Sequence, residues 1–258
     1  DTTATLNWAG SSTANNFQYW FGPAGFFQGT TTTAGVKAFS TTSGVVVDTL
    51  SQFTCYEFLV RTVCQPGDTS AWSAPFQFCT PCSPITAPYF EDWDGLTSGT
   101  KDLGCFSSIE DPSFATSNFI GVTIQSSTFY NPISLPNYVE LDNSSSTSSP
   151  LLLVSPPTTD MDAGDKRIVF YSRATFAGTP PSSVIVGTMS DGNDATTFNG
   201  LDTIAVDGAA FTRYVVDLTT SNGYNGTDMF FAIAHGQDAT FRTVLVDDLT
   251  YETIPTCP

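Results

Sequence analysis

Charged residues, and basic residues above all, are scarce in this sequence. Only 13% of its 258 residues are charged, and 8 Lys and Arg residues stand against 25 Asp and Glu, which gives a formal net charge of −17. Because binding to nucleic acid requires a basic surface that neutralises phosphates, this balance excludes a nucleic-acid partner. It equally argues against binding to an anionic membrane surface. Such acidity is typical of an extracellular protein and offers carboxylates to divalent cations.

Long hydrophobic runs and catalytic motifs are also missing from the sequence. No apolar run reaches about 18 residues, so we expect no insertion into a membrane. His235 is the only histidine, and no G-x-S-x-G motif accompanies it, so nothing indicates a Ser-His-Asp triad. No Gly-rich loop of the phosphate-binding type occurs. We therefore expect no enzymatic activity.

Short β-branched and aromatic runs, separated by clusters of Gly, Pro, Asn, Asp and Ser, occupy most of the chain. Examples are residues 168–171, 183–186, 214–218 and 230–234. Such runs predict strands that are joined by turns. No segment has the period of an amphipathic helix. The sequence therefore predicts an all-β fold of sandwiches or jelly rolls, divided into one large or two ordinary domains.

The first part of the chain carries three segments with the pattern of sandwich strands. They are residues 4–8, 56–63 and 72–80. Together they resemble a fibronectin type III module, in which Tyr56 would be the tyrosine of the corner motif. Because only Asp1–Thr3 precede the first of these segments, the resemblance implies that the first strand of the module is missing from this chain. We assign residues 1–82 to this β-sandwich.

A second resemblance extends over residues 83–256. The segments that carry it are Pro88–Asp92, Cys105–Phe106, Leu151–Pro157, Lys166–Arg173 and Val244–Thr250. They are similar to a MAM-like jelly roll, close to the cleaved-adhesin domains of Bacteroidetes surface proteins. Phe106 stands where that family has Trp, whereas the acidic pair in Val244–Thr250 is the most specific match. The resemblance implies a jelly-roll sandwich that is larger than the first domain.

The end of the chain resembles the beginning of another module. Its Cys257-Pro258 step is similar to the step that opens a fibronectin type III module in bacterial surface proteins. Residues 257–258 would then be the start of a next module. A chain of this kind is typical of one period in a tandem array, although an arbitrary fragment would have the same ends.

Acidic residues lie near both ends of the predicted jelly roll. In jelly rolls of this kind the opening and closing strands are neighbours, so acids on the two strands face one another. Carboxylates that are brought together repel unless a cation lies between them, and Ca²⁺ prefers several oxygen ligands. We predict one structural Ca²⁺ site formed by Glu91, Asp92, Asp247 and Asp248. Weaker candidates are Asp94 and Asp142, and the alternative is a set of solvated acids that cap turns.

Strand alternation predicts one disulfide in the first domain. If Tyr56 points into the sandwich, Cys55 points outward, because successive side chains in a strand face opposite sides. If Phe76 and Phe78 point inward on the neighbouring strand, Cys79 points outward too. Cys55 and Cys79 would then face each other and form a bond.

The four remaining cysteines are assigned by their positions in the chain. Cys82 and Cys105 both lie near the start of the second domain, where we predict a bond that closes a loop. Cys64 and Cys257 are left, and we predict that each bonds its counterpart in a neighbouring repeat. The alternatives are free thiols or a different pairing within the chain, because sequence alone does not fix connectivity.

The two resemblances imply a function outside the cell. The chain would be a repeat unit of a large secreted surface adhesin or filament, with neighbouring copies as partners and a role in attachment or gliding. The alternative is a glycan-binding accessory module of an extracellular bacterial enzyme, with surface glycans as ligands. Bacteroidetes also export proteins with an O-glycosylation signal of Asp followed by Ser or Thr, which Thr2, Thr49 and Thr203 fit.

Overall fold

The computed structural model describes residues 3–10, 16–27, 35–65, 67–206 and 208–256. The chain divides into two compact units, unit 1 at Asp1–Ser83 and unit 2 at Pro84–Pro258. This division lies next to the boundary at 82–83 that we expected from the sequence. All strand pairs of the sheets are antiparallel, and the helices of the described residues are short 3-10 turns, so the predicted all-β class is confirmed.

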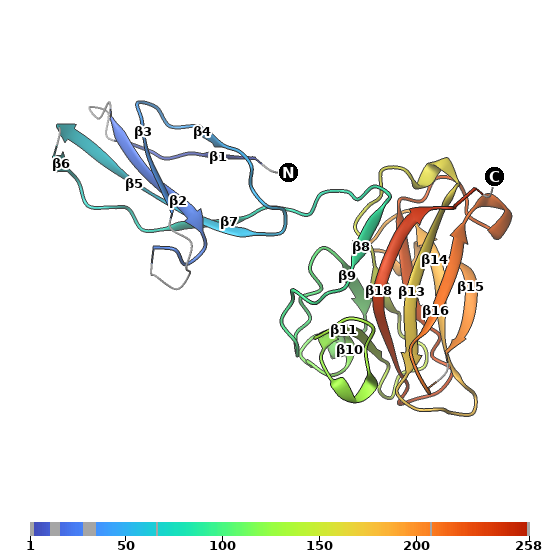
Figure 1. Ribbon diagram of the computed structural model, residues 1–258. Coiled ribbons are helices and arrows are strands. Elements are labelled where there is room, and N and C mark those ends of the chain that lie inside the picture. Colours follow the sequence, from blue (N-terminus) through green and yellow to red (C-terminus); the bar gives the residue numbers. More distant parts are fainter. Residues whose placement is uncertain (1–2, 11–15, 28–34, 66, 207, 257–258) are drawn as a thin grey trace. The chain divides into compact units, whose positions relative to one another are not determined.

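Unit 1 consists of two antiparallel sheets. Its strands are β1 (Ala4–Leu6), β2 (Phe17–Pro23), β3 (Val36–Ser40), β4 (Val45–Val47), β5 (Cys55–Gln65), β6 (Asp68–Thr69) and β7 (Phe76–Cys79). In the described residues β1 pairs only with β4, whereas β2 lies between β3 and β5 in the other sheet (Figure 1). The short strands β6 and β7 both pair with β5. One layer of this unit is therefore much narrower than the other.

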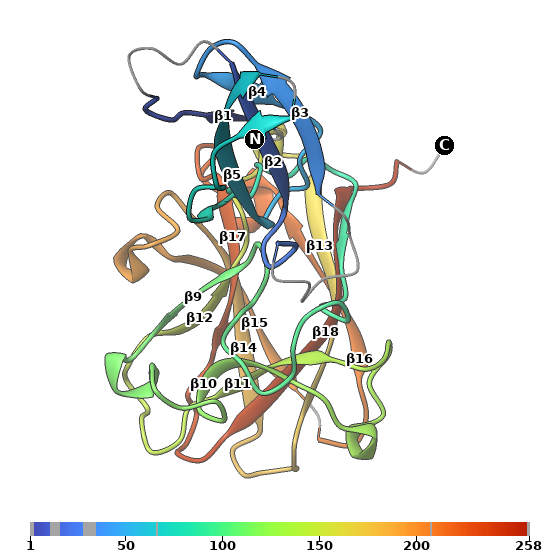
Figure 2. The ribbon, with the colours of Figure 1, turned by 90° about the vertical axis from the view of Figure 1, so that its left-hand side faces the viewer.

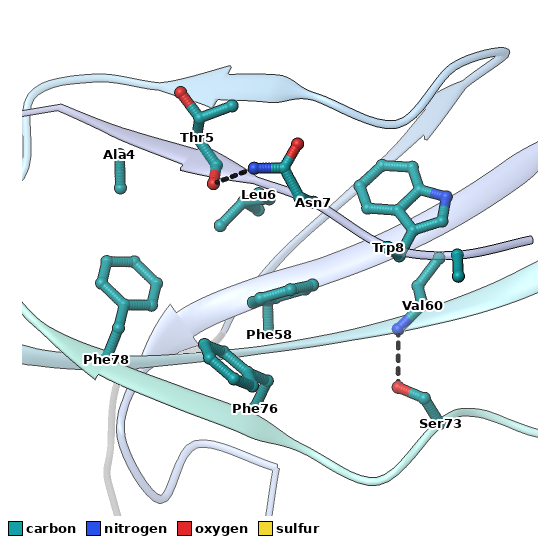
Figure 3. A pocket seen from close by; sticks show the side chains of 11 residues that line it. Ala4, Thr5, Leu6, Asn7, Trp8, Phe58, Val60, Ser73, Phe76 and Phe78 are labelled. Carbon is teal, nitrogen blue, oxygen red and sulfur yellow. Dashed lines mark hydrogen bonds between the residues drawn. The ribbon is translucent and has the colours of Figure 1, made fainter.

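Aromatic side chains form much of the interior of unit 1. The rings of Tyr56, Phe21 and Phe78 pack against one another, and the Tyr56 centroid lies 5.3 Å from that of Phe21 and 5.9 Å from that of Phe78. Leu6 from the narrow layer and Phe58 from the wide layer are both buried (Figure 3). The backbone N–H of Ser51 donates a hydrogen bond of 2.8 Å to the Tyr56 hydroxyl, which ties the chain before β5 to that strand.

Unit 2 is a larger sandwich of two antiparallel sheets. Its strands are β8 (Tyr89–Glu91), β9 (Ser107–Glu110), β10 (Gly121–Gln125), β11 (Tyr138–Asp142), β12 (Leu151–Val154), β13 (Lys166–Ala174), β14 (Ser182–Met189), β15 (Asn199–Val206), β16 (Thr212–Leu218), β17 (Phe230–His235) and β18 (Thr243–Thr253). One sheet has the order β10-β11-β18-β13-β16, with β8 also paired to β18. The other has the order β15-β14-β17-β12-β9. Figure 2 shows β9 beside β12, and β10 beside β11.

The core of unit 2 lies between these sheets. Alternate residues of β13, such as Ile168 and Phe170, are fully buried and meet Val184, Val186 and Ile233 from the opposite sheet. The strand runs expected from the sequence fall within β13, β14, β16 and β17. Short 3-10 turns complete the unit: η1 (Pro112–Phe114), η2 (Thr128–Tyr130), η3 (Met161–Ala163), η4 (Ala195–Thr197) and η5 (Thr220–Asn222). In the described part of the chain, no helix is long and apolar enough to cross a membrane.

Candidate functional site

The opening and closing strands of unit 2 are neighbours, as the sequence predicts. Strand β8 pairs with the second half of β18, where Glu91 lies opposite Leu249 (Figure 1). This pairing brings the acids that follow β8 towards Asp247 and Asp248 of β18. The predicted acidic region therefore lies on β18, between the stretch that pairs with β11 and the stretch that pairs with β8.

Glu91 and Asp92 accept hydrogen bonds from residues close to them in the chain. Glu91 accepts a hydrogen bond of 2.7 Å from the Tyr89 hydroxyl and one of 3.1 Å from the N–H of Trp93. Burial raises the pKa of Glu91, these two hydrogen bonds oppose that shift, and the charge of Asp92 adds to it. Asp92 accepts the N–H of Asp94 at 3.0 Å. Both Glu91 oxygens therefore have a donor.

Asp247 holds a distant loop. Its side chain is fully buried and accepts the N–H of Ile133 at 2.6 Å and that of Ser134 at 3.3 Å. The N–H of Asp248 donates to the same carboxylate at 2.9 Å. Burial raises the pKa of Asp247 to about 6, against the effect of these backbone donors. The carboxylate thus anchors the segment between β10 and β11 to the centre of the sheet.

Asp248 differs from its neighbour because one of its oxygens has no donor. Its Oδ1 atom is buried and has no hydrogen-bond partner among the described residues. The backbone of Asp248 has a φ of 45°, in the left-handed region that few non-glycine residues adopt. Burial raises the pKa of this carboxyl, the Ser134 hydroxyl lowers it, and the charges of Asp92 and Asp94 raise it further. One oxygen of Asp248 is therefore buried among acidic groups without a hydrogen-bond donor from the described residues.

The structure does not assemble the four predicted ligands into one set. No group of three or more His, Cys, Asp or Glu side chains within the described ranges is placed to hold a metal ion. Asp142 lies at the opposite end of β11 and accepts hydrogen bonds from Ser144 and Thr243. The Ca²⁺ site stays a prediction, and neutral oxygens would have to complete its coordination.

Two residues of this region escaped the sequence analysis. Ser134 contacts the Asp247 carboxylate, and the Asn137 N–H donates to Asp94 at 2.9 Å. The Asn137 side chain, which is buried, also donates to the carbonyls of Trp93 and Leu96 at 2.9 and 2.8 Å. Both residues lie in a loop far from the acids along the chain, so no local pattern could have identified them.

A groove lies on the outer face of the five-stranded sheet. It has a volume of about 490 Å³ and is lined by Leu152, Ile185 and Ala234 from the strands and by Phe198 from the loop that follows η4. Hydroxyl and amide groups surround this apolar floor, among them Gln237. Small-molecule sites are typically lined by apolar and aromatic side chains with a few polar groups, and the lining of this groove contains both kinds of group.

The cysteines follow the predicted pattern in part. Cys55 and Cys79 lie opposite each other on β5 and β7 and form a disulfide, which is the pairing that strand alternation predicts. Cys82 and Cys105 are each disulfide-bonded as well. Cys64 is an exposed free thiol. Cys257 lies outside the described residues, so the predicted inter-repeat bond stays a prediction.

The predicted O-glycosylation sites are accessible where the structure describes them. Thr49 and Thr203 both lie at the surface of the units that carry them. The Thr49 hydroxyl donates to the carbonyl of Asp48 at 2.7 Å. Thr2 lies outside the described residues.

No family model and no curated protein matches the chain. Solved structures that are similar to it include the K2 cleaved adhesin domain of Lys-gingipain, with 18% identity, coverage of 65% of this chain and 98% of that chain, and a TM-score of 0.47. The K1 cleaved adhesin domain of Lys-gingipain from Porphyromonas gingivalis W83 has 17% identity, coverage of 66% and 99%, and a TM-score of 0.46. The CBM22-1 xylan-binding domain from Paenibacillus barcinonensis has 10% identity, coverage of 68% and 100%, and a TM-score of 0.41. Similarity at this level assigns no function to the chain.

Proposed function

We propose that the chain is a structural and adhesive repeat unit of a large secreted surface protein, without enzymatic activity of its own. The observation that carries this proposal is the series of two β-sandwich units in one chain, with a disulfide between exposed cysteines in the first. Stable sandwiches joined in series can hold a distal partner away from a cell. Disulfides are typical of oxidising compartments, which supports a place outside the cell, and the charge of −17 would keep neighbouring fibres apart.

We assign unit 1 to the fibronectin type III modules in this proposal. Two features support the assignment beyond the sequence resemblance. The first is the hydrogen bond between Ser51 N–H and the Tyr56 hydroxyl, which has the geometry of a tyrosine corner. The second is the narrow layer of β1 and β4, which has room for a further strand.

The same proposal includes covalent joints between repeats. Cys64 lies at the end of β5 and its thiol is exposed, so it is accessible to a cysteine of another copy. Cys257 of a neighbouring repeat would be that cysteine. Such bonds would resist shear at the joints, because a cross-link limits the separation of the segments that it connects.

We retain Ca²⁺ as a structural ion of unit 2. The buried Oδ1 of Asp248 lacks a donor, and the charges of Asp92 and Asp94 act on it. A hard cation would satisfy this oxygen and relieve the repulsion. In this arrangement Asp248 and Asp92 would bind the ion, whereas Glu91 and Asp247 would fix the surrounding backbone through the hydrogen bonds described above.

The alternative function is a glycan-binding module. It is favoured by the groove on the outer face of the five-stranded sheet, where the Phe198 ring lies among polar groups. A sugar would stack on Phe198 and bind to the hydroxyl and amide groups around it. Bacterial surface glycans are the ligand class in that case.

A glycan array on the intact chain separates these two functions. The structural role predicts no defined ligand, and it predicts that the parent protein contains tandem copies of the chain. A binding module would give a reproducible ligand whose binding falls in the Phe198→Ala variant. Binding of that ligand would be unchanged in the Phe129→Ala variant, because Phe129 is 80% exposed on η2, outside the groove. A defined ligand with this mutational pattern would overturn the purely structural role.

A further inference from the structure

The only histidine of the sequence is buried at the end of β17. His235 is 3% exposed, and neither function named above uses its imidazole. The backbone N–H of Gln237 donates a hydrogen bond of 2.8 Å to the Nδ1 atom of this imidazole. A ring nitrogen that accepts a hydrogen bond carries no proton, so the imidazole is neutral, with its proton on Nε2. The Nε2 atom is buried and has no hydrogen-bond partner among the described residues.

The hydrogen bond to His235 holds a turn with an unusual backbone. Gln237 has a φ of 54°, in the left-handed region that few non-glycine residues adopt, and the bond offsets part of the cost of this conformation. The Gly236 N–H donates to the Ser183 carbonyl at 2.8 Å. The Gln237 side-chain amide donates to the Ser149 carbonyl. The turn at Gly236 and Gln237 therefore connects β14 with the segment that precedes β12.

The same turn forms part of the groove on the outer face of the five-stranded sheet. Gly236, Gln237 and Ser149 all line that groove. The bond between the Gln237 side chain and Ser149 joins two lining segments that lie far apart in the chain. The shape of the groove therefore depends on the position of the turn, and the position of the turn depends on the acceptor at His235.

A second proton on the imidazole is incompatible with this turn. An imidazolium ring has an N–H donor at both nitrogens, so its Nδ1 atom can no longer accept a hydrogen bond. Two N–H groups would then point at each other across 2.8 Å, and the Gln237 N–H would have to move away. The cation would also be buried without a partner at Nε2, which is costly in a protein interior. Protonation therefore favours a form in which the turn is released and the imidazole reaches water.

The charged groups around His235 come from the loop that follows it and from the opposite sheet. Burial lowers the pKa of His235, whereas the charge of Asp238, the backbone of Arg242 and the charge of Asp142 raise it. The strands that pair with β17, β12 and β14, carry no charged residue. Because burial has the largest effect, the neutral form persists to a pH below the ordinary histidine value of 6.5. The stabilisation of the turn is therefore complete above that value and is lost as the pH falls.

We propose that His235 is a pH-sensitive switch for the groove of unit 2, in which the neutral imidazole holds the Gly236 and Gln237 turn in the groove wall and protonation releases it. Histidine is suited to such a role because a small change in pH alters both its charge and its hydrogen bonds. A ligand that fits the groove at neutral pH would bind less tightly in acid. The inference concerns the turn and not the ligand, so it does not depend on either function named above.

Amide hydrogen exchange of the full chain, followed by NMR as the pH is lowered, tests the switch. The protection of the Gln237 N–H, relative to its intrinsic exchange rate at each pH, should fall by up to about tenfold per pH unit below about 6.5. The Thr227 N–H is the matched control, because Asn225 Oδ1 accepts it at 2.9 Å in a turn of the same length and does not titrate. Its protection should stay constant. If the imidazole signal titrates while the protection of Gln237 stays constant, the proposal is overturned.

Two variants separate the proton from the hydrogen bond. Asparagine can accept the N–H two residues later but does not titrate, so the His235→Asn variant should keep the protection of Gln237 independent of pH. The His235→Phe variant has no acceptor, so the protection of Gln237 should be low at every pH. If the release of Gln237 in His235→Asn has the same pH dependence as in the natural sequence, a carboxylate is the sensor and the proposal is wrong. Circular dichroism verifies folding, and the titration of the natural sequence decides the question if a variant does not fold.

The side-chain amide of Gln237 reports on the groove itself. Its bond to the Ser149 carbonyl should be lost with the same pH dependence as the backbone bond to His235. The exchange of the side-chain N–H₂ signals in the same NMR series measures this. A side-chain amide that stays protected in acid, while the backbone N–H is released, would overturn the link between His235 and the groove.

Discussion

Removal of the Cys55–Cys79 disulfide should destabilise unit 1 by a loop-entropy effect almost alone. The two cysteines are exposed on paired strands, so their replacement by serine removes little buried surface. The bond closes a loop with a sequence separation of 24. For a loop of this length, the chain-entropy model gives a loss of about 3.5 kcal/mol at 25 °C. That loss is a large part of the roughly 5–15 kcal/mol by which a domain is stable.

Urea unfolding of the full chain measures this loss. Trp8, Trp20 and Trp72 lie in unit 1, so tryptophan fluorescence reports mainly on that unit, whereas Trp93 is buried in unit 2. The double variant Cys55→Ser, Cys79→Ser should lower the free energy of unfolding of unit 1 and leave that of unit 2 unchanged. Cys64→Ser is the control, because that thiol is free and exposed. A loss below about 1 kcal/mol, or an equal loss in unit 2, would refute the reasoning.

Three further predictions concern single side chains. Burial, with a smaller effect of the Asp142 charge, raises the pKa of Glu140 to about 7. The stability that the bound proton provides is therefore complete at a pH below the ordinary pKa of Glu, and it is lost as the pH rises through about 7. Glu140→Gln should therefore flatten the pH dependence of the unit 2 melting temperature, and an unchanged slope would contradict this. Ca²⁺ at about 100 times its Kd should stabilise unit 2 by about 2.7 kcal/mol, and the Asp248→Asn variant should lose this gain. If a chelator leaves the melting temperature of unit 2 unchanged, the structural ion is excluded. Tyr56→Phe removes the acceptor of the Ser51 N–H and should lower unit 1 stability by about 1 kcal/mol in urea titrations, with no effect on unit 2.

Local pattern was sufficient to predict the strands and one disulfide. Alternation places Tyr56 inside and Cys55 outside, and the observed Cys55–Cys79 pair follows from that alternation. Alternation also orients Phe76 correctly towards the interior. Alternation could not predict that Phe76 is 61% exposed, because the burial of an inward-facing side chain depends on the width of the opposite layer.

The acidic region shows where sequence reasoning reaches its limit. The adjacency of β8 and β18 was expected, and it brings Glu91 close to the closing strand. The role of Asp247 was not expected, since this carboxylate binds the backbone of Ile133 and Ser134, more than a hundred residues earlier in the chain. A buried carboxylate that holds a loop and one that binds a cation have the same sequence pattern. Only the hydrogen-bond partners distinguish them.

Disulfide mapping by mass spectrometry on the unreduced native protein tests the central claim most directly. The account of a covalently joined repeat fibre predicts a peptide in which Cys64 of one copy is bonded to Cys257 of another, within a parent that contains several copies. The exposed thiol of Cys64 makes this bond accessible without unfolding of unit 1. A free Cys64 in the native assembly, or a bond between Cys64 and Cys257 of the same copy, would contradict it.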